Sequence, residues 1–195
     1  MGRGGDEGQR MSDVVDYIKV YNGWLNAKEC KSKIKDLKKS KWEKHSFAIY
    51  DETGISISGD KELTVSYGDE SDNAYMMQRI WDGIHHYITE LNMPWFNGWN
   101  GFSQVRYNRY EPGQTMAMHC DHINTLFDGQ RKGIPILSVV GLMNDNYTGG
   151  EFIMCGKEIE LMAGDLLVFP SVFMYPHMVN PVTTGVRYSL VSWVW

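Results

Sequence analysis

The C-terminal half of the chain is a succession of short apolar segments, and this pattern constrains the fold more than any other feature. Between residues 103 and 195 these segments are separated by turns rich in Gly, Pro and Asn, and no periodic segment of helical length interrupts them. Many short strands at this spacing are typical of sandwiches and jelly-roll barrels. The segments are SQVRYNRY, TMAMHCD, PILSVVGLMN, EFIMCG, KEIELM, DLLVFPS and VRYSLVSWVW.

The N-terminal half mixes helical and strand-like patterns. Residues 12–25 predict an opening strand, and Asn26, three residues before Glu29, predicts the start of a helix that runs to about Lys39. Short strands are expected between residues 42 and 68, and a second helix at about 72–91. Its buried face is expected to carry the apolar residues that recur at helical spacing, namely Met77, Ile80, Ile84, Ile88 and Leu91.

These patterns predict a mainly β protein with flanking helices (α+β) and a double-stranded β-helix, or jelly-roll, core. A chain of 195 residues is the size of one domain. We expect residues 1–11 to be a flexible extension and residues 12–195 to be a single domain. Within that domain, residues 12–100 form the helical flank and residues 101–195 the jelly-roll core.

Charge, cysteine content and hydropathy exclude several classes of protein. The net charge of −5 argues against a binder of nucleic-acid backbones. The lysine-rich segment from Lys31 to Lys41 is interpreted as a solvated helix face. Three cysteines without paired spacing argue against a disulfide framework. No apolar stretch approaches the roughly 18 residues of a membrane span, and no signal sequence is present, so we expect a cytoplasmic protein.

Two histidines and one aspartate form a candidate metal site. Residues i and i+2 of a strand point to the same face, so His119 and Asp121 can converge while Cys120 points away. His177 follows 56 residues later, after another strand. Two histidines and one carboxylate brought together in this way are the facial triad of non-haem Fe(II) oxygenases, which leaves coordination positions open.

A basic residue on the last strand adds a candidate anion site. Arg187 lies ten residues after His177 and shares a strand face with Ser189. A guanidinium binds a carboxylate through two parallel hydrogen bonds, as a dicarboxylic keto acid chelating the iron would require at its far end.

The C-terminal half resembles the prolyl 4-hydroxylase family of Fe(II)/2-oxoglutarate dioxygenases, especially its small bacterial and phage-type members. The matching blocks are RYNRYEPGQTMAMHCD, TGGEF and AGDLLVFPSVFMYPHMVNPVTTGVRYSLVSW. The resemblance implies a double-stranded β-helix that uses Fe(II), 2-oxoglutarate and O2, with ascorbate as reductant. The implied reaction is 4-hydroxylation of a prolyl residue in a peptide or protein, with succinate and CO2 as co-products.

The resemblance also assigns roles to individual residues. His119, Asp121 and His177 match the iron ligands, and Arg187 matches the basic residue that binds the far carboxylate of 2-oxoglutarate. Three further positions match residues of the cosubstrate pocket or of the substrate side near the metal. Tyr110 and Ser138 match pocket residues near 2-oxoglutarate, and Trp193 matches a tryptophan that lines the pocket near the metal.

Departures from the family pattern leave the substrate open. Relatives often begin the central strand with a substrate-contacting arginine, whereas Ile134 and Pro135 stand there in this chain, and Leu142 replaces a tyrosine found in some members. Another amino acid, a small peptide or a nucleic acid is therefore an alternative substrate, although the ending RYSLVSW lacks the second arginine of the base demethylases. A jelly-roll module that holds a non-catalytic metal is the alternative from a different class.

Overall fold

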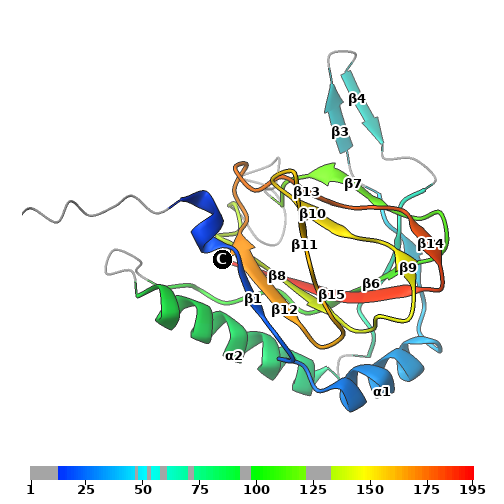
Figure 1. Cartoon of the computed structure of the whole chain (residues 1–195), viewed down its shortest axis with the longest axis horizontal. Helices are drawn as coiled ribbons and strands as arrows, with labels where there is room; N and C mark the ends of the chain where they lie inside the picture. Colours follow the sequence, from blue (N-terminus) through cyan, green and yellow to red (C-terminus); the bar gives the residue numbers. More distant parts are fainter. Residues whose placement is uncertain are drawn as a thin grey trace, which may run out of the picture.

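A seven-stranded antiparallel sheet joins strands from both halves of the chain (Figure 1). The computed structural model describes residues 13–46, 48–51, 54–57, 61–69, 73–92, 98–121 and 133–195, so the predicted extension at residues 1–11 lies outside the described residues. In spatial order the strands of this large sheet are β1 (Lys19–Tyr21), β12 (Leu166–Pro170), β8 (Leu137–Leu142), β15 (Arg187–Val194), β6 (Arg106–Tyr110), β5 (Thr64–Ser66) and β2 (Glu43–Lys44).

A smaller sheet faces the inner side of the large one. Its four strands, in spatial order, are β11 (Lys157–Ile159), β10 (Phe152–Met154), β13 (His177–Val179) and β7 (Met116–His119). Two short ladders complete the described strands: β9 (Thr148–Gly149) with β14 (Val182–Thr184), and the hairpin of β3 (Ala48–Asp51) and β4 (Gly54–Ile57), which projects from the body of the molecule in Figure 1. The prediction of a mainly β, double-stranded β-helix fold is confirmed.

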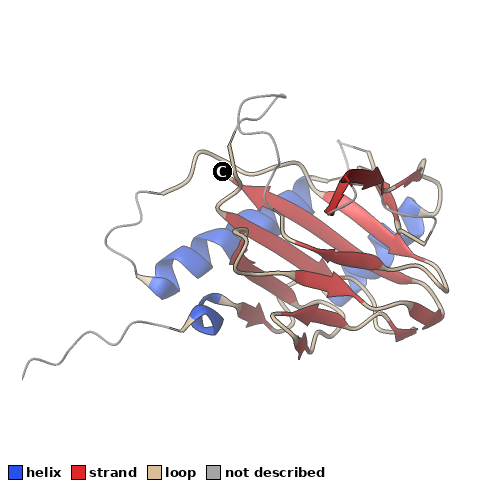
Figure 2. Ribbon diagram, turned by 90° about the horizontal axis from the view of Figure 1, so that it is seen from above, coloured by secondary structure: helices blue, strands red, loops and turns tan. Residues whose placement is uncertain are grey.

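Two helices cover the outer face of the large sheet (Figure 2). Helix α1 spans Ala27–Leu37, and its first turn is capped by the Asn26 side chain, which accepts a hydrogen bond from the Lys28 amide at 2.9 Å. Helix α2 spans Ala74–Leu91 and ends at Asn92, which adopts a left-handed conformation. Both helices lie where the sequence predicted them, within two residues at each end.

The large sheet is buried on both faces, and its strands alternate between two cores. In β8 and β12, Leu137, Val139, Leu166 and Val168 pack against the helices, together with Ile80 and Ile84 of α2. The intervening residues face the smaller sheet, and with it they form a second core that contains Val140, Leu167, Phe169, Phe152 and Met154. This double burial explains why these strands read as continuous apolar runs instead of alternating ones.

Some local predictions were wrong. The opening segment is not one strand, because Val14–Tyr17 form a 3-10 helix and only Lys19–Tyr21 pair with β12. The lysine-rich face of α1 is not wholly solvated, since Lys33 is buried and its Nζ lies 5.7 Å from the centre of the Tyr107 ring. Among the described helices, none combines the length and the apolar character needed to cross a membrane.

Gly149 provides a test of the close backbone approach in the short β9–β14 ladder. Its φ of 72° is in the left-handed region, and a Cβ added there would clash with the Pro181 carbonyl oxygen. We expect Gly149→Ala to lower the free energy of unfolding by about 2–3 kcal/mol, since backbone strain and a clash with main chain add. Denaturant unfolding followed by circular dichroism measures the change.

Gly156→Ala is the matched control for this prediction. Gly156 has almost the same φ, 76°, but a Cβ there would have no neighbour within 4 Å. It should therefore lose only the strain contribution, about 1 kcal/mol. Equal losses of unfolding free energy in the two variants would show that the clash with Pro181 does not contribute to the destabilisation.

Candidate metal centre

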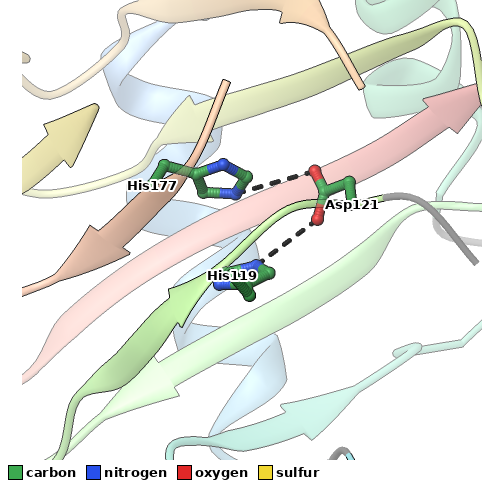
Figure 3. A group of neighbouring side chains, drawn as sticks. All are labelled: His119, Asp121 and His177. Atoms are coloured by element: carbon green, nitrogen blue, oxygen red, sulfur yellow. Dashed lines mark ion pairs between the residues drawn. The ribbon is translucent and has the colours of Figure 1, made fainter. Parts of the chain in front are cut away.

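Two histidines face each other at the ends of adjacent strands of the smaller sheet. His119 is the last residue of β7 and His177 the first residue of β13, and the two are direct partners in the antiparallel ladder. Their ring centres are 4.3 Å apart. The chain bends after β7 and brings the Asp121 carboxylate between the two rings (Figure 3). One potential ligand atom from each of the three residues lies within 4.8 Å of the others.

The hydrogen bonds of both imidazoles set the tautomer that a metal requires. Nδ1 of His119 lies 2.8 Å from the carbonyl oxygen of Ala117, and Nδ1 of His177 lies 3.0 Å from that of Tyr175. A carbonyl oxygen only accepts, so Nδ1 carries the proton in each ring and Nε2 carries the lone pair. The Nε2 atoms lie 3.4 Å and 3.7 Å from the two oxygens of Asp121. The three residues therefore fit an Fe(II) site of the two-histidine, one-carboxylate type.

The protonation states agree with metal binding at neutral pH. Burial raises the pKa of Asp121. The hydrogen bond with His119, electrostatic attraction to both imidazoles and the hydrogen bond from Ser138 outweigh burial and hold this pKa well below its usual range. Burial lowers the pKa of His177, which keeps this imidazole neutral near pH 7. A metal would thus displace few protons from Asp121 and His177.

The strand geometry used to predict the site is incomplete. Asp121 does not continue β7 but lies in a bend two residues beyond its end. The Cys120 side chain does turn away from the site, because its Sγ donates to the carbonyl oxygen of Phe173 at 3.4 Å, yet it is half-buried instead of being a core residue.

Ser138 lies beside the metal centre and not where the resemblance suggested. Its hydroxyl donates to Oδ2 of Asp121 at 2.6 Å and lies 2.7 Å from the Ser171 hydroxyl. On β8 it pairs with Trp193, six residues along β15 from Arg187, a distance of about 20 Å along the strand. Ser138 therefore orients the aspartate and does not reach the position expected for the far carboxylate of 2-oxoglutarate.

Arg187 lies at the start of β15, away from Ser138, and has the features of an anion-binding site. It is 1 % exposed, and its only hydrogen bond to the described residues runs from Nη1 to the Ser189 hydroxyl at 3.1 Å. Its Nε is buried without a hydrogen-bond partner, and no described carboxylate forms an ion pair with it. The guanidinium lies 5.1 Å from the centre of the Tyr110 ring, on the adjacent strand. A buried cation of this kind is costly unless an anion binds to it.

One cleft between the two sheets contains both the triad and Arg187. Strand β6 adds to its wall two polar side chains that the sequence analysis did not single out, Arg106 and Asn108. Arg106 stands four residues and Asn108 two residues before Tyr110. Alternate residues of a strand share a face, so this spacing was the sequence signal that could have placed them beside Tyr110. The lining residues are Arg106, Asn108, Tyr110, Met116, His119, Asp121, Val140, Phe152, His177, Val179, Arg187, Ser189, Val191 and Trp193.

Residues 105–195 match the family model described as the 2OG-Fe(II) oxygenase superfamily. A PKHD-type hydroxylase of Stenotrophomonas maltophilia is 38 % identical over 95 residues, which cover 46 % of this chain and 41 % of that protein. One of Delftia acidovorans is 37 % identical over 97 residues, which cover 45 % and 41 % of the two chains. The chain thus spans about two fifths of the length of these curated relatives.

Solved structures share the fold at low sequence identity. A viral collagen prolyl hydroxylase from Paramecium bursaria Chlorella virus-1 has a TM-score of 0.62 at 18 % identity and covers 93 % of this chain and 98 % of its own. A Pseudomonas putida prolyl-4-hydroxylase has a TM-score of 0.61 at 20 % identity, covering 93 % and 96 %. A Trichoplax adhaerens prolyl hydroxylase, solved with a hypoxia inducible factor peptide fragment, has a TM-score of 0.67 at 18 % identity, covering 93 % and 87 %.

Fold and sequence comparisons agree on what the C-terminal half of the chain is similar to. Residues 105–195 match the 2OG-Fe(II) oxygenase superfamily in sequence, and the described fold agrees with that match. The predicted resemblance to the prolyl 4-hydroxylases is confirmed by the PKHD-type hydroxylase relatives and by the shared fold. This class implies Fe(II), 2-oxoglutarate and O2, and the donor set of the cleft fits the metal.

Ser138→Ala tests the support that the hydroxyl gives to the metal ligand. Loss of this hydrogen bond leaves a buried carboxylate less stabilised, so protons compete better with the metal. We expect the Kd for Mn(II), measured by calorimetry at pH 7, to rise about tenfold. Ser192→Ala is the control, because Ser192 is equally buried but donates to the Ser103 carbonyl oxygen at 2.8 Å instead of to Asp121. An equal rise in both variants would contradict this role of Ser138.

Arg187→Met tests the anion site. Loss of a charge-assisted pair of hydrogen bonds corresponds to about 1.5–3 kcal/mol, so the Kd of 2-oxoglutarate for the Zn(II)-loaded protein should rise about 10–100-fold. Arg187→Lys should lose less, because it keeps the charge but not the fork. Unchanged affinity in a folded Arg187→Met protein would show that the cosubstrate binds elsewhere.

Proposed function

We propose that this protein is an Fe(II)- and 2-oxoglutarate-dependent oxygenase that hydroxylates prolyl residues of a peptide or protein at the 4-position. The co-products are succinate and CO2, and ascorbate serves as reductant. We further propose that residues 12–195 act as one domain, because β1, β2 and β5 of the N-terminal half join the same sheet as β6, β8, β12 and β15.

The observation that carries this proposal is the presence of two complementary sites in one cleft. The two-histidine, one-carboxylate set of His119, Asp121 and His177 lies between the sheets, and the buried fork of Arg187 lines the same cleft. A metal site alone is compatible with a non-catalytic module. A buried, unpaired arginine in the same cleft is instead what a chelating dicarboxylate requires at its far end.

Different residues of the cleft bind 2-oxoglutarate, orient it and exclude water. Arg187, with Ser189 and Tyr110, holds the far carboxylate of 2-oxoglutarate, which directs the keto end toward the triad. Burial raises the pKa of Tyr110, so its phenol stays protonated and can donate a hydrogen bond to that carboxylate. Val140, Phe152 and Val191 line the cleft with apolar surface that excludes water. When bound, iron and 2-oxoglutarate supply the oxidative chemistry that activates O2 and hydroxylates a C–H bond.

The comparisons support a prolyl residue as the target. All three of these similar structures are prolyl hydroxylases by name; one is named for collagen, and another was solved with a peptide fragment. The relatives that match in sequence are PKHD-type hydroxylases. We infer a proline-containing peptide as substrate on this basis and leave the residues that flank the proline to experiment.

Succinate formation tests the reaction. The protein is incubated with Fe(II), 2-oxoglutarate and ascorbate, with and without a pool of proline-containing peptides. We expect the pool to raise succinate formation several-fold, and mass spectrometry to find peptides heavier by one oxygen on proline. His119→Ala should remove the signal, because it deletes a metal ligand.

Arg109→Met serves as the activity control. Arg109 lies on β6 next to the cleft residues, but it contacts Thr64 and Trp42 on the outer side of the sheet. This variant should keep most of the activity. Peptides oxidised on a residue other than proline would contradict the substrate class while leaving the oxygenase intact. Absence of succinate from folded, metal-loaded protein under all conditions would favour a binding module.

A further inference from the structure

We propose that Arg106 forms a second carboxylate-binding site in the cleft, on the substrate side of the metal centre, so that the preferred substrate presents a carboxylate close to the hydroxylated carbon. This inference rests on the proposed oxygenase function and narrows its substrate class. The carboxylate could belong to an acidic side chain next to the target proline or to a free C-terminus.

The register of the large sheet places the two arginines of the cleft at opposite ends. On β6, Arg106, Asn108 and Tyr110 share the inner face, and Tyr110 pairs with Arg187 while Arg106 pairs with Val191. Four residues of antiparallel strand separate the two ends by about 13 Å. One dicarboxylate of the size of 2-oxoglutarate, chelated at the triad, cannot engage both arginines. Arg106 is therefore left for a different ligand.

The guanidinium of Arg106 is held in place by neutral groups. Its Nε donates to Oδ1 of Asn108 at 3.1 Å, and its central carbon lies 4.7 Å from the centre of the Trp193 ring. These contacts orient the planar group but use only one of its five N–H donors. Neither terminal nitrogen of Arg106 forms a hydrogen bond with a described residue.

No carboxylate in the described part of the chain neutralises Arg106. Asp121 is near enough to attract it electrostatically, but no ion pair joins the two. Both oxygens of Asp121 are engaged elsewhere, since Oδ1 faces His119 and Oδ2 faces His177 and accepts from Ser138. The outer-face arginine of the same strand differs in this respect, because Arg109 has Glu111 at 3.6 Å.

An oriented and half-buried guanidinium in a cleft selects for carboxylates. Two of its N–H groups match the two oxygens of a carboxylate, and the partly buried setting makes the pairing stronger than on an open surface. A neutral amide of the same shape offers only one acceptor oxygen and leaves charge unpaired. Discrimination between an acid and its amide is therefore the property that Arg106 should give the enzyme.

The test compares peptide binding without turnover. Zn(II)-loaded protein with 2-oxoglutarate is titrated calorimetrically with short blocked peptides that contain Asp-Pro or Pro-Asp, and with the matching Asn peptides. A second pair is Ala-Pro with a free carboxylate or an amide. We expect at least one acid to bind about tenfold tighter than its amide, and the pair that shows the preference identifies the source of the carboxylate.

Three variants assign the preference to Arg106. Arg106→Met should abolish the difference between acid and amide, Arg106→Lys should keep part of it, and Arg109→Met on the outer face should keep all of it. The Kd of 2-oxoglutarate should stay within about twofold in Arg106→Met, which would show that the cleft is intact. A merely structural role for Arg106 on Trp193 predicts instead that acid and amide peptides weaken together.

The outcomes separate this inference from the proposed function. Peptides with Ala in place of Pro are titrated as well, and equal binding of the Pro and Ala forms counts against prolyl specificity without touching Arg106. Equal affinity of acid and amide for the unmodified protein, or no binding of any acid peptide, overturns the carboxylate site. So does an acid preference that survives in Arg106→Met.

Discussion

The site depends on one constraint, which is that both faces of the large sheet are buried. Helices α1 and α2 cover the outer face with a mainly apolar contact. Side chains alternate along a strand, so the neighbours of the residues in that contact must face the smaller sheet. On β15 this alternation sends Leu190 and Val194 to the helices and Arg187, Ser189 and Trp193 into the cleft. A slip of one residue would bury the arginine under the helices, so packing of the outer face holds the register of the site.

The metal centre obeys a different requirement, since a buried carboxylate needs partners that compensate for lost water. Asp121 obtains them from His119 and His177 across the β7–β13 ladder and from Ser138 on the facing sheet. These contacts tie the two sheets together at the point where the ligands converge. A metal bound there would link the two imidazoles and the carboxylate by direct bonds. Metal binding would therefore stabilise the folded arrangement of the two sheets, and that arrangement in turn positions the ligands.

The electrostatics of the cleft are opposite in sign to those of the chain as a whole. The chain carries a net charge of −5, while the cleft contains two arginines that lack an ion-pair partner among the described residues. A cleft lined by cations selects for small anions and acidic groups. The selection comes from direct hydrogen bonds and ion pairs inside the cleft instead of from long-range attraction by the whole chain. On our proposals, Arg187 provides this selectivity for the cosubstrate and Arg106 provides it for the substrate.

Strand alternation and helical spacing are local properties, so the sequence was enough to predict the jelly-roll class and the positions of both helices. The grouping of His119, Asp121, His177 and Arg187 followed from the family resemblance together with their places near predicted strands. The sequence did not reveal β9, β13 and β14, which have two or three residues each and do not stand within one of the apolar segments. Only the tertiary structure placed the Ser138 hydroxyl on Asp121 and Arg106 in the cleft wall. The reason is physical: these neighbours come from strands far apart in the chain, and their pairing is decided by packing of the whole sandwich.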